Sequence, residues 1–148
     1  MNLGRPVAPS GPNVIEERRR ADPKRDRTRL SVLLQLSREL GRGGDHLALA
    51  QRVTEVAVPA LADWCAVDLR DHRGDLQRVA IRQQPHGGGG RSQLAVPMTV
   101  SGRVTGVLSL ARVGDHGYDR DDLAFAEELA RRVAIAIDHA LCCTTRRG

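Results

Sequence analysis

The chain has 148 residues, with 23 Lys+Arg against 18 Asp+Glu, three cysteines and only three aromatic side chains. This length predicts one domain with a core of Leu, Val and Ala, and no apolar run approaches the roughly 18 residues that a membrane helix needs. The pattern of the first residues is not the one expected of a secretory signal, and three cysteines are not expected to make a disulfide framework. We therefore expect a cytoplasmic protein with no membrane partner.

The excess positive charge is concentrated at the amino terminus. Residues 1–29 carry eight basic and four acidic side chains, which is +4 of the total net charge of +5. Prolines interrupt the first 13 residues, which have no hydrophobic period, so we expect a disordered basic arm over residues 1–24 and a single domain over residues 25–148. Because the arm has no stacking aromatic residues, a solvated extension is favoured over a nucleic-acid-binding element.

Two helices are predicted in the first half of the chain. Asp22-Pro23 is a helix start, and Gly41 is a typical helix stop. Asp45 caps the second helix, which Pro59 should kink or end. The expected apolar stripes are Leu30, Leu33, Leu34 and Leu40, widened by Val32 and Leu36, in the first helix, and Leu49, Val53, Val56, Ala57 and Leu61 in the second.

The hydrophobic period then changes to two and predicts two hairpins. Residues 64–70 and 76–82 form the first pair, and residues 92–100 and 104–112 form the second. An acidic turn at 119–122 opens a last helix with an apolar stripe of Leu123, Ala126, Leu129, Ala130, Val133 and Ile137. The order helix, helix, hairpin, hairpin, helix predicts an α+β domain with an antiparallel sheet.

Three motifs in succession resemble those of a GAF domain of the actinobacterial signalling type. They are Val58-Pro59-Ala60-Leu61-Ala62-Asp63-Trp64-Cys65-Ala66-Val67-Asp68-Leu69 before and in the first strand, residues 91–98 with 102–110 in the second hairpin, and residues 118–123 with 135–140 in the last helix. The resemblance covers about residues 28–141. It implies small-molecule sensing or dimerisation in a regulatory protein, and no reaction.

The segment between the hairpins departs from the family that the chain resembles. GAF domains usually carry a further strand and helices there that enclose a ligand, whereas this chain has Gln83-Gln84-Pro85-His86-Gly87-Gly88-Gly89-Gly90-Arg91. A linker of this length reaches roughly 30 Å when extended. It can therefore cross the roughly 14 Å of three strand spacings in a four-stranded sheet of order 2-1-4-3, with the helices packed on one face.

Strand parity assigns the side chains to two faces of this sheet. We expect a core face of Cys65, Val67, Leu69, Val79, Ile81, Leu94, Val96, Met98, Val100, Val104, Leu108 and Leu110. The other face should be small and polar, and open or covered by the linker or by another protein; it comprises Trp64, Ala66, Asp68, Arg78, Ala80, Arg82, Gln93, Ala95, Pro97, Thr99, Thr105, Val107 and Ser109.

Any ligand should bind this second face, and the positions predicted for it are Trp64, Asp68, Arg78 and Arg82. The alternative is that these four are ordinary surface residues of a half-solvated sheet, because enclosed concavity is what ordinarily makes a site. No histidine or cysteine spacing indicates a metal, and the glycine clusters lack the Lys-Ser/Thr of a phosphate loop. We therefore predict no metal, no cofactor and no catalytic residue.

One enzymatic branch of the GAF family, the free methionine-R-sulfoxide reductases, uses cysteines in the middle region and the adjoining strand. This chain has Cys65 on the expected core face and Cys142 and Cys143 near its end, which does not match. The prediction is a non-enzymatic regulatory or signalling module that forms a homodimer through its first and last helices and contacts an unidentified signalling protein. The alternatives are a small-molecule sensor with its ligand on the Trp64/Arg78 face, or a fragment of a larger sensor kinase or phosphatase.

Overall fold

The computed structural model describes residues 23–85, 91–114 and 117–147. The described elements are α2 (Pro23–Gly41), α3 (His46–Ala57), β1 (Trp64–Arg70), β2 (Leu76–Gln83), β3 (Arg91–Val100), β4 (Arg103–Val113) and α4 (Arg120–Arg147). This confirms the predicted order of elements, with the strand ends within one residue of expectation. The predicted cap at Asp22 and residues 1–22 of the expected arm lie outside the described residues.

Local side-chain chemistry explains where two of the helices begin. The Asp45 carboxylate accepts a hydrogen bond from the backbone N–H of Ala48 at 2.7 Å and caps α3. At the start of α4, the backbone N–H of Asp119 donates to the Asp122 side chain and that of Asp122 donates to the Asp119 side chain, each at 2.9 Å. These reciprocal bonds satisfy two backbone donors that have no partner within the helix.

The four strands form one antiparallel sheet in the order β2-β1-β4-β3, as predicted. The turn between β1 and β2 is stabilised by the Asp71 side chain, which accepts from the backbone N–H groups of Arg73 and Asp75 at 2.9 and 3.0 Å. The second hairpin places β3 at the edge opposite β2, so that residues 84–90 connect the two edges of the sheet.

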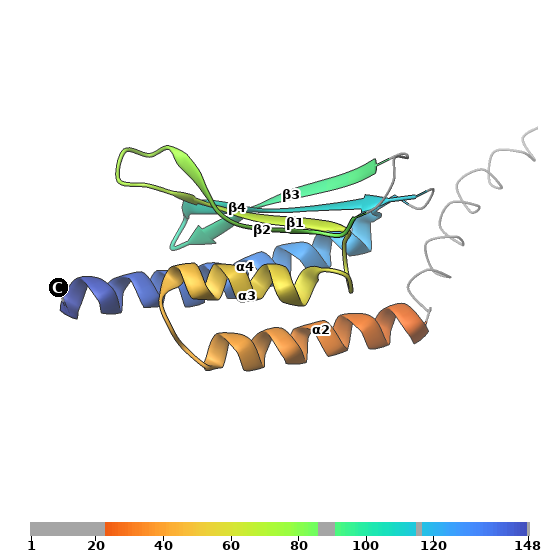
Figure 1. Cartoon of the computed structure of the whole chain (residues 1–148), viewed down its shortest axis with the longest axis horizontal. Coiled ribbons are helices and arrows are strands. Elements are labelled where there is room, and N and C mark those ends of the chain that lie inside the picture. Colours follow the sequence, from red (N-terminus) through yellow and green to blue (C-terminus); the bar gives the residue numbers. More distant parts are fainter. Residues whose placement is uncertain (1–22, 86–90, 115–116, 148) are drawn as a thin grey trace, which may run out of the picture.

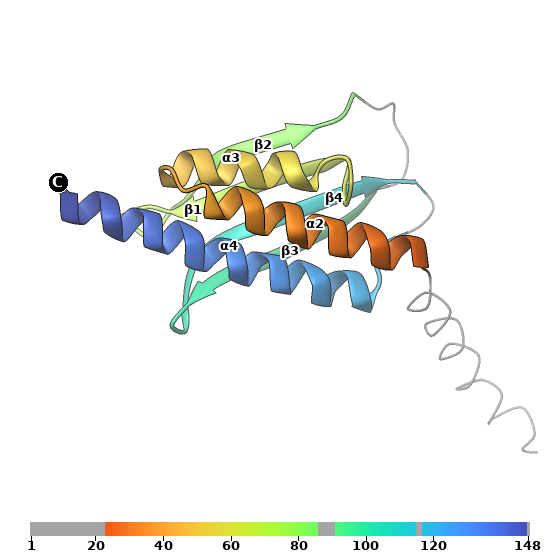
Figure 2. The ribbon, with the colours of Figure 1, turned by 90° about the horizontal axis from the view of Figure 1, so that it is seen from below.

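The sheet forms one layer, and the helices form two further layers on one side of it (Figure 1). α3 and α4 lie against one face of the sheet, and α2 packs over them as the outermost layer, in the groove between them (Figure 2). None of the described helices covers the other face of the sheet. The helices also lack, over their described length, the combination of length and apolar character that crossing a membrane requires.

The apolar stripe of α2 is turned relative to the sequence prediction. Within Pro23–Gly41, the buried side chains are Val32 and Leu36, whereas Leu30 and Leu34 are 58% and 59% exposed. Residues two apart in an α-helix point in nearly opposite directions, so the two pairs cannot share one contact face. The prediction that Leu30 and Leu34 form the buried stripe was therefore wrong, and α2 carries apolar side chains on both its inner and its outer face.

The two hairpins join where β1 pairs with β4, and Gly106 of β4 lies against the backbone of β1. Gly106 lies opposite Leu69 in the ladder. A Cβ at Gly106 would lie 2.3 Å from the carbonyl oxygen of Asp68 and 3.1 Å from the side chain of Leu69. Only glycine fits this close approach without a shift of the backbone.

We expect the substitution Gly106→Ala to lower the free energy of unfolding by about 1–3 kcal/mol, the usual cost of forcing an extra methyl group into packed structure. Urea denaturation followed by circular dichroism measures this change. Gly41→Ala is the matched control, because a Cβ at Gly41 would meet nothing within 4 Å. Equal stability of the two variants would show that β1 and β4 tolerate a wider spacing.

Candidate functional site

The uncovered face of the sheet is built from residues that stand opposite one another in the strand ladders. Directly paired residues of antiparallel strands point to the same face. Trp64, Ala66 and Asp68 of β1 therefore share this open face with the residues to which they pair. These are Gln83, Ile81 and Arg78 on β2, and Ala111, Ser109 and Val107 on β4.

A bulge in the β1–β2 ladder changes which β2 residues reach the open face. The register shifts between Val67, which pairs with Ala80, and Asp68, which pairs with Arg78, so β2 contains one extra residue at Val79. From Ala80 onward, each β2 side chain points to the face opposite the one that strict alternation predicts. Ile81 lies on the open face and is 47% exposed, while Ala80 faces the helices and is 5% exposed. The predicted faces of Ile81 and Ala80 were therefore wrong.

The same bulge separates Arg82 from the other predicted ligand residues. Arg82 pairs with Cys65, whose side chain is fully buried on the helix-covered face. It therefore points away from the open face, whereas Trp64, Asp68 and Arg78 come together there. Strict alternation along β2 could not have shown this, because a bulge breaks the alternation on which the prediction relied.

A second bulge, in the β3–β4 ladder, adds another apolar residue to the open face. Met98 pairs with Gly106 but Thr99 pairs with Val104, so the shift moves Val104 from the predicted core face to the open face, where it is 37% exposed. Leu76, which pairs with Arg70, is 49% exposed on the same face. The open face is consequently more apolar than the small, polar surface that the sequence predicted.

Trp64, Asp68 and Arg78 form one interacting group on this face. The Arg78 guanidinium donates from Nε to Oδ1 of Asp68 at 3.0 Å and from Nη2 to Oδ2 at 3.3 Å. Its Cζ lies 5.3 Å from the centroid of the Trp64 ring, within the range of a cation–π contact. Ala66 lies between Trp64 and Asp68 on the open face and is nevertheless fully buried. The bidentate ion pair therefore fixes the guanidinium over the aromatic ring.

A shallow groove of about 520 Å³ adjoins this group. It offers an aromatic face, a half-exposed guanidinium, a hydroxyl and an amide, and its volume falls within the range of small-molecule sites. Its chemistry would suit a small planar molecule that stacks on the indole and accepts a hydrogen bond from Arg78. The lining residues are Trp64, Arg78, Gln93, Leu94, Ala95, Ser109, Leu110 and Ala111.

The cysteine side chains that the structure describes provide no activated nucleophile in this groove. Burial raises the pKa of the Cys65 thiol to about 12, so this thiol stays protonated at neutral pH. Cys142 is exposed near the end of α4, away from the sheet. Among the described residues, no three His, Cys, Asp or Glu side chains come together in a way that could hold a metal ion.

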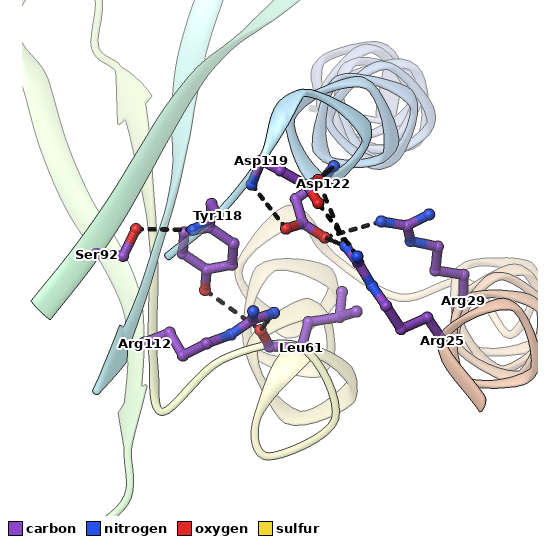
Figure 3. A network of polar contacts seen from close by, with 8 residues as sticks. All are labelled: Arg25, Arg29, Leu61, Ser92, Arg112, Tyr118, Asp119 and Asp122. Carbon is purple, nitrogen blue, oxygen red and sulfur yellow. Dashed lines mark hydrogen bonds and ion pairs between the residues drawn. The ribbon is translucent and has the colours of Figure 1, made fainter. Parts of the chain in front are cut away.

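A second polar site, which the sequence analysis did not identify, joins the amino-terminal ends of α2 and α4 (Figure 3). Arg25 Nη1 lies 3.1 Å from Oδ2 of Asp119, and Arg25 Nη2 and Arg29 Nη2 lie 2.6 and 2.8 Å from Oδ1 of Asp122. We call these four residues the α2–α4 ion cluster. The sequence indicated the acids only as a helix start, because their basic partners lie more than 90 residues away.

Residues next to the α2–α4 ion cluster hold the loop that leads into β1 (Figure 3). The Tyr118 hydroxyl donates to the carbonyl oxygen of Leu61 at 3.2 Å, and Arg112 Nη2 donates to the same oxygen at 3.3 Å. Burial raises the pKa of Tyr118 to about 12, so the hydroxyl keeps its proton. The backbone N–H of Tyr118 also donates to Ser92 Oγ at 2.9 Å. These contacts tie β3, β4 and the start of α4 to the loop before β1.

The fold and the open-face groove define a class of protein: an α+β domain whose antiparallel sheet is covered by helices on one face and bears the candidate site on the other. Within that class, the family model described as GAF domain matches residues 67–138. This part of the chain is therefore similar to a GAF domain, and the structural matches below show the same fold. No curated protein matches the sequence significantly.

Solved structures with the same fold come from several bacteria. The GAF domain of a phosphoenolpyruvate-protein phosphotransferase from Coxiella burnetii aligns with a TM-score of 0.66 and 18% identity, over 80% of this chain and 97% of that one. The GAF domain of a putative sensor histidine kinase from Pseudomonas syringae pv. tomato aligns with a TM-score of 0.64 and 17% identity, over 90% and 98%. Free methionine-R-sulfoxide reductase from Neisseria meningitidis, solved with its substrate, gives 0.68 and 20%, over 83% and 95%.

We expect the substitution Arg78→Ala to change the fluorescence of Trp64, the sole tryptophan of the chain. Removing the guanidinium exposes the indole ring to water, so the emission should shift to longer wavelength and acrylamide quenching should increase. Arg82→Ala is the matched control, because Arg82 lies on the opposite face. Equal spectral changes in both variants would contradict the bulge at Val79 and the assignment of Arg82 to the helix-covered face.

Proposed function

We propose that this GAF domain is a non-enzymatic regulatory module of a signalling system, acting through protein–protein contacts of α2 and α4 and forming a homodimer through these helices. Its fold occurs in a GAF domain of a putative sensor histidine kinase. The observation that carries the proposal is the apolar outer surface of α2. Leu30 and Leu34 lie one helical turn apart on the outermost layer and are each more than half exposed.

The polar surroundings of these leucines resemble the rim of a protein interface. A surface hollow of about 410 Å³ along α2 is lined by Arg27, Leu30, Ser31, Leu34, Gln35, Arg38 and Glu39. Apolar side chains at the centre with charged and polar ones around them are typical of interaction surfaces. α4 adds Ile135, which is 57% exposed, and Leu141, which is 39% exposed. Burying these four side chains against a second copy of the chain would remove apolar surface from water and so favour a dimer through both helices.

The non-enzymatic part of the proposal is supported by the state of the cysteines. A reductase that acts on methionine sulfoxide through cysteine needs an accessible thiol of low pKa. Cys65 is fully buried and has a raised pKa, and the open-face groove is lined by no cysteine among the described residues. The structural likeness to the Neisseria enzyme therefore extends to the fold, and we do not transfer its reaction to this chain.

We further propose that the domain is of the actinobacterial signalling type, cytoplasmic, and shortened between its hairpins. The shortening is supported by the seven residues that separate Gln83, the last residue of β2, from Arg91, the first of β3. An additional strand with helices does not fit into a linker of this length. The open-face groove would then lack the walls that relatives build from this segment.

We expect the chain to have twice its monomer mass in multi-angle light scattering, and the substitution Leu34→Glu to convert it to a monomer. A charge at the centre of the interface would be buried without a partner. Because Leu34 is exposed in one subunit, the variant should keep its stability within about 0.5 kcal/mol.

Leu47→Glu is the matched control, since Leu47 of α3 is 49% exposed and lies outside the α2 hollow. This variant should remain dimeric. A wild-type chain that stays monomeric at every concentration would overturn the homodimer, and loss of the dimer in both variants would place the interface elsewhere.

The second candidate function is small-molecule sensing on the open face, and the Trp64–Asp68–Arg78 group favours it. The ion pair holds the guanidinium over the ring in a fixed geometry, and pre-organised side chains lower the entropic cost of binding. Against it stands the openness of the face, because a small molecule there would keep much of its surface in water. Contact through α2 and α4 therefore remains the first candidate.

If contact alone is the function, nucleotides, amino acids and aromatic metabolites should not raise the melting temperature of the domain beyond scatter. A ligand that binds the folded state would stabilise it in a saturable way. A differential scanning fluorimetry series on the wild type, Arg78→Ala and Arg82→Ala separates the cases. A saturable shift that is lost in Arg78→Ala and kept in Arg82→Ala would replace the first candidate with the second.

A further inference from the structure

α2 is anchored to the rest of the domain by fewer fully buried apolar side chains than α3. Within Pro23–Gly41 it buries Val32 and Leu36, and Leu33 and Leu40 are partly buried against the core, whereas α3 buries six side chains over a shorter length. α2 is the outermost layer, over α3 and α4 (Figure 1). Segments that bury little apolar surface open at a lower free energy than the core of a domain. The position of α2 therefore also depends on polar contacts.

The α2–α4 ion cluster supplies those contacts at one end of the helix (Figure 3). Arg25 bonds to both acids and Arg29 bonds to Asp122, with distances of 2.6 to 3.1 Å. The four side chains are 11% to 26% exposed, so water and salt screen them less than they screen a surface pair. Each arginine lies on the face of α2 that turns toward α4.

The two carboxylates are held in place independently of α2. Their hydrogen bonds to the backbone N–H groups at the start of α4 fix both side chains. Partial burial alone would raise the pKa of Asp119, but the hydrogen bonds from Arg25 and from the backbone N–H of Asp122 outweigh it and hold the pKa well below its usual range. The acids therefore present a preformed, charged docking point for the arginines of α2.

The connection from α2 to α3 can act as the hinge of a movement of α2, because Arg52 of α3 donates to the carbonyl oxygen of Gly43 at 2.5 Å and holds this end of the helix. The connection contains Gly43 and Gly44 with φ of +74° and +114°, a backbone region that glycine adopts without strain. On the inner side of α2, Val32 and Leu36 meet Val53, Val56 and Leu129 around a residual cavity of about 10 Å³. Departure of α2 would uncover these apolar side chains and leave the sheet, α3 and α4 packed together.

We propose that α2 is a releasable helix, fastened to the start of α4 by Arg25 and Arg29, and that it opens in a step separate from global unfolding. This release step goes beyond the proposed function. It determines whether the outer surface of α2 stays in place. It also determines whether an apolar groove between α3 and α4 is accessible. The equilibrium between the docked and the released helix depends on the α2–α4 ion cluster.

Native-state hydrogen exchange measured by mass spectrometry tests this proposal. The double variant Arg25→Gln/Arg29→Gln should lower the protection of α2 amides by about tenfold or more, the effect expected from losing hydrogen bonds between charged groups. The protection of amides in β1 and β4 should not change. The variant should also bind more of a hydrophobic dye, because Val53 and Val56 become accessible.

Arg27→Gln/Arg38→Gln is the matched control, with the same charge change on the exposed side of the same helix. Because both arginines line the α2 hollow, this control is compared in the Leu34→Glu background, where it should leave the protection of α2 unchanged. Repeating the series in a Leu34→Glu background removes any protection that a dimer contact would add, so failure of the homodimer and failure of the release step remain distinguishable. In the wild type, high salt should lower the protection of α2 amides selectively.

Three results would overturn the release step. One is unchanged α2 protection in Arg25→Gln/Arg29→Gln. Another is an equal loss of protection in α2 and in the sheet, or a double variant that no longer folds, since either places α2 in the global cooperative unit. The third is an equal effect of the control variant, which would trace the change to the charge or propensity of the helix rather than to the ion cluster.

Discussion

The pairing of β1 with β4 is the constraint on which the rest of the structure depends. Each hairpin forms locally, but the two share one sheet only because Cys65, Val67 and Leu69 stand opposite Leu110, Leu108 and Gly106. The side chains of this central ladder are buried under α3 and α4. α3 precedes the strands in the chain and α4 follows them, so this pairing holds both helices over one sheet. The missing side chain at Gly106 lets the two backbones approach at Asp68, which in turn positions Asp68 for Arg78.

The two faces of the sheet therefore carry different kinds of side chain. The helix-covered face carries the core, and the open face carries the Trp64–Asp68–Arg78 group together with exposed apolar side chains. The edges of the sheet are poorly suited to adding strands from another molecule. β3 contains Pro97, which cannot donate a ladder hydrogen bond, and β2 is distorted by its bulge at Val79. The contacts proposed for this domain accordingly use faces rather than edges, either the outer face of α2 or the open face of the sheet.

Much of this fold follows from local patterns in the sequence. Turn residues, caps and the change of hydrophobic period predicted the elements. The strand order was the one that the resemblance to GAF domains implies, and the linker length showed that the chain can adopt it. What failed was the side to which particular residues point. A bulge is one additional residue, and nothing in Leu76-Gln77-Arg78-Val79-Ala80-Ile81 marks where it occurs. In α2, leucine and valine occur around much of the helix, so periodicity alone could not select Val32 and Leu36 over Leu30 and Leu34.

The α2–α4 ion cluster could not be predicted for a different reason, and that reason bears on its role. Asp119 and Asp122 are fully explained as a helix start, and Arg25 and Arg29 lie in the basic stretch of residues 1–29, at the start of the predicted domain. Each half is ordinary by itself, and only the layer arrangement brings the halves together. Asp122 takes part in two sets of contacts, because its Oδ2 caps α4 and its Oδ1 binds both arginines. The cap uses an oxygen that the arginines do not bind, so the proposed release of α2 leaves this capping bond of α4 in place.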